Sequence, residues 1–532
     1  MPDRLRGAAP LIAIVGAGLG LRLVFAYLVF PGAGYPSDLG LFSTWATTLG
    51  ASGPGSFYAS AATADYPPGY LYLLWLIGSI GRVVGEVTGL PPGDVAAALL
   101  KTPAILADTA IAIVLYAAGR RWFGPSVGLI AATLYLFVPV TWFDSALWGQ
   151  IDAVGTLVLI VAVVLLIEGW SEPAVALTVL AVLIKPQYAI ALGVVLPVLV
   201  RRHLIAVGSG PVPTLGGRLA RLDAGLGGLL RRQGPIRLAT SALIGSVALL
   251  VPLLPFDIAQ FATPSLADVP GIGHVAGLMG LFAQVGGEFS VVTANAYNAW
   301  ALVGDHPLAS VIGSSGAAWT SDSVVVIAGL PAVFVGGVLL VAVGAVIAGG
   351  LLRRDGRTPI LLAATILALA FYLLPTRVHE RYLFPFFALG ALLAASSLRV
   401  GIAYVGVGLL NAVNLHAVLA GAVNIRKPGG GFEGGRGGLG GGGGVGGFGP
   451  GGAVGFGGGG PGSDRFVSID LPFADLARNE LVVAAVAIGQ TAVLVGLLAW
   501  WVSIIVRPDR HAATVEAGSS SLRLGSGART MR

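Results

Sequence analysis

Apolar residues recur along this chain in long stretches that are separated by short polar connections. A helix of about 20 apolar residues covers the ~30 Å hydrocarbon core of a bilayer. On this criterion we predict an all-α polytopic membrane protein with about 12 transmembrane helices. The predicted spans are 8–30, 95–118, 126–142, 153–168, 173–185, 187–200, 238–256, 323–349, 359–375, 382–398, 401–424 and 480–505.

One further apolar segment, Gly69–Gly81, follows the double proline Pro67-Pro68 and has only about 13 residues. Runs of this length are more typical of interfacial segments than of spans. If it does not cross the membrane, the arginine-rich connections all fall on one side, as the positive-inside bias requires. They are Arg4/Arg6, Arg120/Arg121, Arg201/Arg202 through Arg237, Arg353/Arg354/Arg357, Arg399 and Arg507/Arg510. We therefore expect a juxtamembrane helix there, and both termini in the cytoplasm.

The composition agrees with this pattern. Hydrophobic residues make up 55% of the 532 residues and charged residues only 11%, against about 25% in soluble proteins. The absence of cysteine excludes disulfides, thiolate metal sites and a cysteine nucleophile. None of the six asparagines lies in a glycosylation sequon, which disfavours a eukaryotic secretory origin, and we expect the protein in a prokaryotic plasma membrane. The arginines form no stripe of the kind that binds nucleic acid.

The charge pattern divides the chain into a transmembrane module (1–424), a glycine-rich external loop (425–479) and a last helix with a cytoplasmic tail (480–532). Within the module we predict external loops at 31–94 and 257–322 and a basic cytoplasmic loop at 201–237. Glycine accounts for 23 of the 34 residues from Gly429 to Gly462. Such a segment is typical of a flexible spacer, although a contact with glycan or cell wall is the alternative.

Polar motifs occur in the predicted external connections. Asp38 precedes an amphipathic stretch that contains Trp45, and it is either a helix N-cap or a catalytic carboxylate. Asp65 and Tyr66 precede the double proline, where a structural turn is the simpler interpretation. The run Asp144-Ser145-Ala146-Leu147-Trp148-Gly149-Gln150-Ile151-Asp152 combines two carboxylates, an amide and an indole, although Trp148 alone could be an interfacial anchor.

Later motifs carry cations and amides. Arg377-Val378-His379-Glu380-Arg381 favours a phosphate site, because guanidinium groups match phosphate oxygens; snorkelling is the alternative. Lys185 lies at a predicted helix break and either binds an anion or reaches the interface. Asn295 and Asn298 alternate with aromatic residues, which suits sugar contacts, capping or loop packing. Asp108 lies within a predicted span, and we expect it to bond a neighbouring helix or to line a cavity.

The order of these motifs resembles that of the GT-C superfamily of glycosyltransferases, which use lipid-phosphosugar donors. Asp38, Trp45 and Asp65-Tyr66-Pro67-Pro68 are similar to the first external loop of the dolichyl-phosphate-glucose glucosyltransferases. His379-Glu380-Arg381 looks like their late His-Glu-Lys motif, with arginine in place of lysine. The Trp148–Asp152 run resembles one found in bacterial mannosyltransferase-like relatives. The resemblance covers residues 8–424 and omits the glycine-rich loop and the last helix.

The resemblance implies a GT-C-like bundle and an inverting hexosyltransferase, of mannose or glucose type, with an external site. A polyprenyl-phosphate-linked sugar is the implied donor, and an acceptor hydroxyl on a glycan, lipid or protein receives the sugar. Asp38 becomes the candidate general base, and the candidates for the donor phosphate are Arg377, His379, Arg381 and Lys185. The implied supporting residues are Asp65, Tyr66, Trp148, Gln150, Asp152, Glu380, Asn295 and Asn298. No metal or other cofactor is expected.

Two other functions fit some of these features. A transporter or flippase of lipid-linked sugars would also be polytopic, but transporters usually bind their substrates near the midplane. A non-catalytic assembly or wall-anchoring protein would use the glycine-rich loop as a tether.

Overall fold

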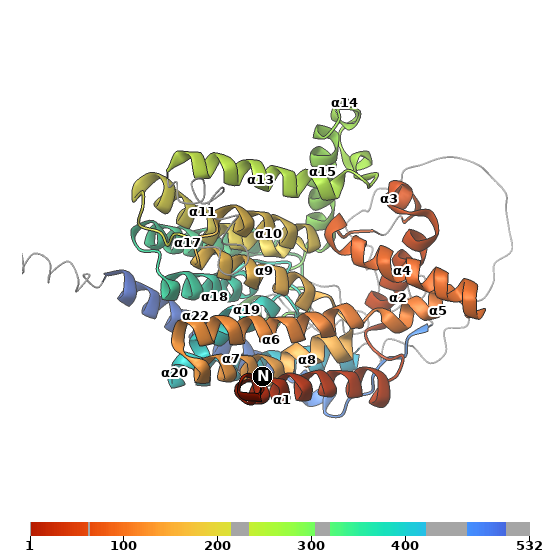
Figure 1. The fold of residues 1–532 in the computed structure, drawn as a ribbon, viewed down its shortest axis with the longest axis horizontal. Coiled ribbons are helices and arrows are strands. Elements are labelled where there is room, and N and C mark those ends of the chain that lie inside the picture. Colours follow the sequence, from red (N-terminus) through yellow and green to blue (C-terminus); the bar gives the residue numbers. More distant parts are fainter. Residues whose placement is uncertain (1, 62–63, 214–233, 304–319, 422–464, 507–532) are drawn as a thin grey trace, which may run out of the picture.

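The computed structural model describes residues 2–61, 64–213, 234–303, 320–421 and 465–506. Most of them belong to helices that run side by side as a bundle (Figure 1). The bundle comprises α1 (Pro2–Leu23) with η1 (Val24–Val29), α6 (Thr102–Phe123), α7 (Pro125–Phe137), α8 (Pro139–Trp142) with η3 (Phe143–Trp148), α9 (Asp152–Ile167), α10 (Ser171–Ile184), η4 (Pro186–Ala191), α11 (Leu192–Val200) with η5 (Arg201–Ile205), α13 (Pro235–Leu253), α17 (Ala332–Arg353), α18 (Arg357–Leu373), α19 (Phe384–Ser396), α20 (Leu398–Gly421) and α22 (Glu480–Val506).

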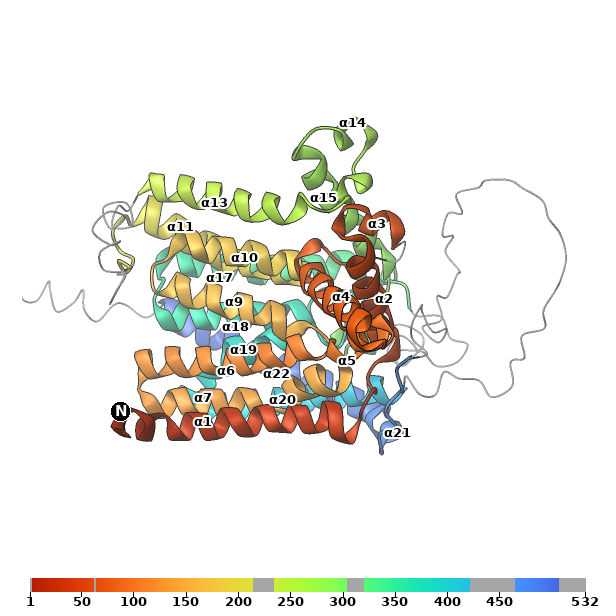
Figure 2. The same ribbon diagram turned by 45° about the vertical axis from the view of Figure 1, so that its right-hand side comes forward.

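Shorter elements complete the fold. Helices α2 (Pro36–Ser52), α3 (Phe57–Ser60), α4 (Pro68–Thr88) and α5 (Pro92–Leu99) gather at the end of the bundle opposite the start of α1, which we call the cap end (Figure 2). The remaining elements are η2 (Pro54–Ser56), η7 (Ile258–Phe261), α14 (Pro264–Ala267), α15 (Ile272–Glu288), η8 (Ala299–Leu302), the antiparallel strands β1 (Val325–Ile327) and β2 (Leu330–Pro331), and α21 (Ala474–Ala477).

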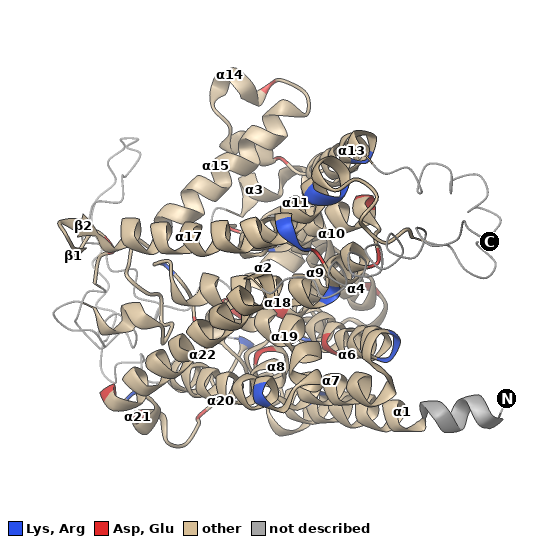
Figure 3. Cartoon of the chain, turned by 90° about the vertical axis from the view of Figure 1, so that its left-hand side faces the viewer, with Lys and Arg blue, Asp and Glu red and all other residues tan. Residues whose placement is uncertain are grey.

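Eight helices among the described residues are long and apolar enough to cross a membrane, or nine if the bent pair α7 and α8–η3 counts as one span. Charged residues are sparse along them (Figure 3). Four of the twelve predicted spans correspond to the shorter apolar helices α9, α10, α18 and α19. The fold is therefore a helical polytopic bundle, while the predicted number of spans is not confirmed.

Several predicted boundaries were wrong. The segment predicted at Gly69–Gly81 is the 21-residue helix α4, because Arg82 and Glu86 continue the helix with an i,i+4 pair until Gly89 ends it in the left-handed conformation. This helix is itself long and apolar enough to span, yet it lies with α2 and α5 at the cap end (Figures 1 and 2).

Two predicted spans are interrupted. The span 126–142 bends by 52° at Pro139, where α7 ends and α8 begins. The span 323–349 begins instead with the β1–β2 hairpin, and its helix starts only at Ala332. The predicted external loop 143–152 is partly helical as well, because residues 143–148 form the fully buried π-helix η3.

Arginines tie together the connections at the end opposite the cap. Arg121 pairs with Glu168 at 2.8 Å, and Arg201 pairs with Asp355 at 2.7 Å. Arg237 pairs with Glu172 at 2.6 Å. These arginines, which the sequence placed on one face of the membrane, thus serve to connect neighbouring helix ends. The predicted cytoplasmic loop 201–237 is described only in part, and 429–462 lies outside the described residues.

The segment 465–469, which follows the predicted glycine-rich loop, runs along the chain that precedes α2. Val467 donates its N–H to the carbonyl of Gly32 at 3.1 Å, and Gly34 donates to the carbonyl of Val467 at 3.0 Å. Ile469 is buried. We call this segment the strap, because it fastens the end of the chain to the cap end.

Candidate active site

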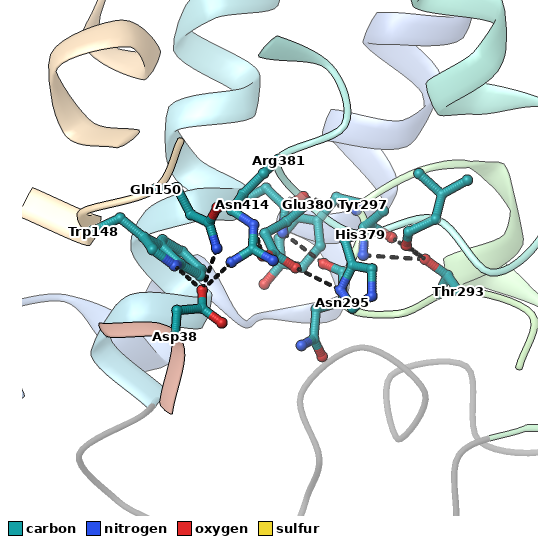
Figure 4. A network of polar contacts seen from close by, with 12 residues as sticks. Asp38, Trp148, Gln150, Thr293, Asn295, Tyr297, His379, Glu380, Arg381 and Asn414 are labelled. Carbon is teal, nitrogen blue, oxygen red and sulfur yellow. Dashed lines mark hydrogen bonds and ion pairs between the residues drawn. The ribbon is translucent and has the colours of Figure 1, made fainter. Parts of the chain in front are cut away.

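Asp38 lies in the first turn of α2. Tyr35 is the N-cap residue and Pro36 occupies the first helical position, so the helix starts without a side-chain cap. The Asp38 carboxylate instead bonds residues outside this helix. Its Oδ2 accepts hydrogen bonds from Trp148 Nε1 at 2.8 Å, from Gln150 Nε2 at 2.7 Å and from Arg381 Nη1 (Figure 4). The N-cap interpretation was therefore wrong, and Asp38 joins two of the motifs seen in the sequence.

The loop after η3 is shaped to bring Trp148 to Asp38. Gly149 ends η3 with a φ of +86°, a conformation that glycine adopts without steric cost. The Trp148 ring stacks on Tyr35 at 4.7 Å, and Tyr35 donates its N–H to the Trp148 carbonyl at 3.0 Å. The Arg381 guanidinium lies 5.0 Å from the Trp148 ring, within cation–π distance. Trp148 is thus a wall of the site rather than an interfacial anchor.

A second ion pair continues this network. Lys185 Nζ lies 2.9 Å and 3.0 Å from the two carboxylate oxygens of Asp152 and 3.2 Å from Gln150 Oε1. Gln150 therefore links the two pairs, because its amide nitrogen donates to Asp38 while its oxygen accepts from Lys185. Lys185 is almost fully buried, in an extended conformation before Pro186 that ends α10. Its charge is directed into the site and does not reach the interface.

The segment between α18 and α19 carries the histidine and arginine motif. Ala294 donates its N–H to the Val378 carbonyl at 2.9 Å, which holds the motif against the loop before η8. Arg381 reaches Asp38, whereas Arg377 pairs with the buried Asp322 at 2.6 Å. The predicted phosphate cations are thus divided between two partners, and only Arg381 contacts the Asp38 network directly.

Burial and charge set the ionisation of this motif. Burial raises the pKa of Asp38, but the charge of Arg381 and the hydrogen bonds from Trp148 and Gln150 outweigh it and hold this pKa below its usual value. Burial, with help from the Arg381 charge, lowers the pKa of His379 to about 3. Burial raises the pKa of Glu380 to about 7, against the opposing effect of Arg381. At neutral pH, His379 is uncharged and Arg381 carries the positive charge.

Arg381 keeps donors that Asp38 does not use. Its Nε is buried, lies 3.4 Å from Glu380 Oε1 and makes no hydrogen bond. Glu380 Oε2 is likewise buried without a hydrogen-bond partner. A buried guanidinium with a donor that makes no hydrogen bond to the protein suits an oxyanion ligand.

The other predicted residues lie around this centre. Tyr66 contacts Phe42 and Trp45 edge to face at 5.6 Å, and its ring lies 5.7 Å from Lys185 Nζ. Asp65 is partly buried beside it; burial raises the pKa of Tyr66, and the charge of Asp65 raises it further.

The two asparagines have different surroundings. Asn298 caps η8 through the Trp300 N–H at 3.1 Å, as one alternative predicted. Asn295 adopts a φ of +67°, and its side chain points away from the network in Figure 4.

Sequence reasoning missed Lys101. Its Nζ donates to the carbonyls of Ala33 at 2.6 Å, Ala146 at 2.7 Å and Leu147 at 3.3 Å. It therefore connects the chain before Asp38 to the helix before Trp148. A lysine at the start of an apolar helix was the available signal, because such charges are rarely without a role.

The prediction that Asp108 bonds a neighbouring helix is confirmed. It is fully buried and bonds two neighbouring helices, through Arg22 Nε at 2.7 Å and the Tyr135 hydroxyl at 2.6 Å. Arg22 also donates to the Leu136 carbonyl and to Thr141. This network joins α1, α6 and α7 just before the bend that leads to η3.

No protein-family model and no curated protein matches this sequence. Among solved structures, it is similar to the oligosaccharyltransferase of Archaeoglobus fulgidus tethered with an acceptor peptide, with a TM-score of 0.37, 14% identity and coverage of 75% of this chain and 50% of that one. The same protein in its apo form gives 0.35, 14%, 76% and 51%. The Archaeoglobus fulgidus enzyme AglB, in complex with an inhibitory peptide and a dolichol-phosphate, gives 0.36, 15%, 91% and 55%. The chain spans about half the length of these proteins, and similarity at this level does not establish a family.

Proposed function

We propose that this protein is an inverting glycosyltransferase that moves a hexose, of mannose or glucose type, from a polyprenyl-phosphate donor to an acceptor hydroxyl. The observation that carries the proposal is the contact between Asp38 and Arg381, which joins a carboxylate base to a buried cation with unused donors. The motif resemblance to GT-C enzymes supports the same pairing of roles. The site lies at the cap end, which we propose to be the external face of a prokaryotic plasma membrane, with both termini cytoplasmic.

The residues suit each part of this reaction. The acceptor oxygen attacks the anomeric carbon, its proton passes to the Asp38 carboxylate, and the bond from that carbon to the phosphate oxygen breaks. The leaving lipid phosphate is then stabilised by Arg381, with Lys185 and neutral His379 close by. Asp38 Oδ1 is the oxygen available to the acceptor, because Oδ2 already accepts three hydrogen bonds. The donor itself supplies the activated sugar, so no cofactor is part of the proposal.

The resting contact between Asp38 and Arg381 gives the donor a second effect. A phosphate that takes over the guanidinium withdraws the charge that keeps the Asp38 pKa low. Asp38 then becomes a better base only when the donor is bound. Donor binding and activation of the base are thereby linked through one residue.

The test uses the purified protein in nanodiscs with a panel of polyprenyl-phosphate-mannose and polyprenyl-phosphate-glucose donors. We expect sugar transfer by the parent protein with at least one donor and loss of transfer in Asp38→Asn. Glu86→Gln is the matched control, because it removes a carboxylate from an exposed pair on α4. Transfer by Asp38→Asn at the parent rate would show that Asp38 is not the base. A parent protein that transports the donors without transferring sugar would support the flippase alternative.

A further inference from the structure

Asn295 has an unusual backbone conformation at the edge of the candidate active site. It lies in the loop before η8, and its φ of +67° is in the left-handed region, which residues other than glycine rarely adopt. Asparagine is tolerated there because its side chain can hydrogen-bond the neighbouring backbone. The Asn295 side chain forms no such bond, and it bonds no other residue that the structure describes. Other groups must therefore hold this conformation.

A buried asparagine on α20 is the main one of these groups. The side-chain nitrogen of Asn414 donates to the Asn295 carbonyl at 2.8 Å, and its oxygen accepts from the Tyr297 N–H at 3.0 Å. Thr293 closes the turn from the other side, because its hydroxyl donates to the Ala296 carbonyl at 2.9 Å. Backbone strain that the surroundings hold in this way is typical of ligand-binding and active sites. The direction of the Asn295 side chain is thus fixed, while its polar atoms stay unused.

The same turn is fastened to the histidine and arginine motif. Ala294 and Asn295 both form backbone bridges with His379. The Asn295 side chain is partly exposed, whereas Ala294 and Ala296 on either side of it are fully buried. Figure 4 shows the Asn295 amide and the Asp38 carboxylate along the same lower edge of the network. The turn therefore presents this amide beside the proposed general base and the proposed phosphate-binding histidine.

An amide in this position suits the hydroxyls of a sugar. Its oxygen accepts hydrogen bonds and its nitrogen donates two, so that it can bond neighbouring hydroxyls of one ring. The sugar of the proposed donor is attached to the phosphate that we assign to Arg381, and its anomeric carbon is attacked by the oxygen that Asp38 activates. The donor sugar must therefore lie next to both residues, on the edge of the network where the Asn295 amide is found.

We propose that Asn295 selects the donor by hydrogen-bonding ring hydroxyls of the hexose that the lipid phosphate carries. The identity of this ligand rests on the proposed function, but the role concerns binding and does not require that the sugar be transferred. Because the turn holds the amide in a fixed direction, it discriminates between hydroxyls that differ only in orientation, as those of mannose and glucose do. Asn414 is then a positioning residue, since it acts on the sugar only through Asn295.

Binding measurements on the full chain in nanodiscs test this role. Calorimetric titration gives the dissociation constants of mannosyl farnesyl phosphate, glucosyl farnesyl phosphate and farnesyl phosphate, and the ratio of the bare lipid to each glycosylated one isolates the contribution of the sugar. Asn295→Gly removes the amide and keeps a conformation that glycine adopts freely. For the preferred hexose we expect this ratio to fall about tenfold in Asn295→Gly, the factor of one hydrogen bond, while farnesyl phosphate binds as in the parent protein.

Deoxy sugars then identify the hydroxyl that is bound. The preferred lipid is prepared with one ring hydroxyl removed at a time. One of these lipids should bind the parent protein about tenfold more weakly than the complete lipid does. In Asn295→Gly the two should bind equally well, because the hydroxyl and the amide act as a pair. Ala299→Gly, which adds a glycine at the exposed start of η8, is the matched control for a looser loop and should behave like the parent.

The outcomes separate this inference from the proposed reaction. An unchanged sugar ratio in Asn295→Gly would overturn the role of Asn295, and so would a parent protein that binds the glycosylated lipids no more tightly than farnesyl phosphate. The same fall in Ala299→Gly would show that loop flexibility is the cause and that the assignment is wrong. A parent protein that binds the sugar through Asn295 but never transfers it would contradict the proposed function and support this inference.

Discussion

Replacing Asp38 by asparagine should weaken catalysis and at the same time strengthen the binding of a lipid phosphate. Asparagine has nearly the same shape, and its oxygen can still accept hydrogen bonds from Trp148 and Gln150. It cannot neutralise the Arg381 guanidinium, however. The substitution therefore removes the carboxylate that contacts Arg381 Nη1 and leaves Glu380, 3.4 Å from Arg381 Nε without a hydrogen bond, as the remaining acidic neighbour.

The structure bounds the size of both effects. The contact between Arg381 and Asp38 is charge-assisted, and such hydrogen bonds contribute about 1.5–3 kcal/mol. A phosphate that no longer competes with Asp38 gains up to this amount, which corresponds to binding that is about 10- to 100-fold tighter. Removal of a general base reduces turnover by about 100- to 10,000-fold. The two changes have opposite directions, which a simple loss of folding would not produce.

The assay is calorimetric titration of nanodiscs with farnesyl phosphate, in the parent protein and in Asp38→Asn. The increase in affinity should vanish when Arg381→Gln is added to Asp38→Asn, because the same guanidinium is responsible. Glu86→Gln should bind like the parent protein. Equal or weaker binding by the Asp38→Asn variant would contradict the view that Asp38 and the phosphate compete for Arg381.

Three other predictions concern the supports of the site. Lys101→Met should lower the free energy of unfolding by about 1–3 kcal/mol and reduce turnover, because three buried carbonyls lose their hydrogen-bond donor. Denaturant titration measures the loss of stability, and transfer assays measure turnover. An unchanged transfer rate would contradict the prediction. Gly78→Ala should reduce thermal stability and activity, because its Cβ would lie 1.7 Å from the Ala46 carbonyl oxygen of α2, whereas Gly20→Ala meets no atom within 4 Å and should be tolerated. Burial raises the pKa of Glu380 from 4.5 to about 7, so the folded protein holds this proton more tightly than the unfolded chain does, and thermal stability should fall as the pH rises from 5 to 7.5. Melting curves of Glu380→Gln should lack this pH-dependent loss of stability. Identical pH profiles for the two proteins would refute the prediction.

The parts of this fold that follow from local pattern could be predicted from the sequence. Stretches such as 480–505 have no competing interpretation, and α22 runs over Glu480–Val506. The first strand was missed because the residues from Val324 to Ile327 are as apolar as a span. Their β-branched side chains, followed by Gly329 with a φ of +78°, were the signal for a hairpin.

The sequence predicted which residues belong to the site, but not all of the contacts between them. Positive-inside bias and motif order placed Asp38, Trp148 and Arg381 on one face, and the structure brings them into contact. The pairing of Lys185 with Asp152 and of Arg377 with Asp322 could not be predicted. These partners are tens of residues apart or lie in loops, and packing of the helices, which leaves no period in the sequence, determines which charges meet.

The strap and α22 are held to the rest of the fold by non-covalent contacts as well as by the covalent chain. Residues 465–506 attach to the rest of the protein through backbone pairing at Gly32 and Gly34 and through helix packing of α22 against α18 and α20. Two separately synthesised polypeptides, 1–424 and 465–532, should therefore associate in the membrane through these contacts. Covalent connection between them then acts by raising their effective concentration.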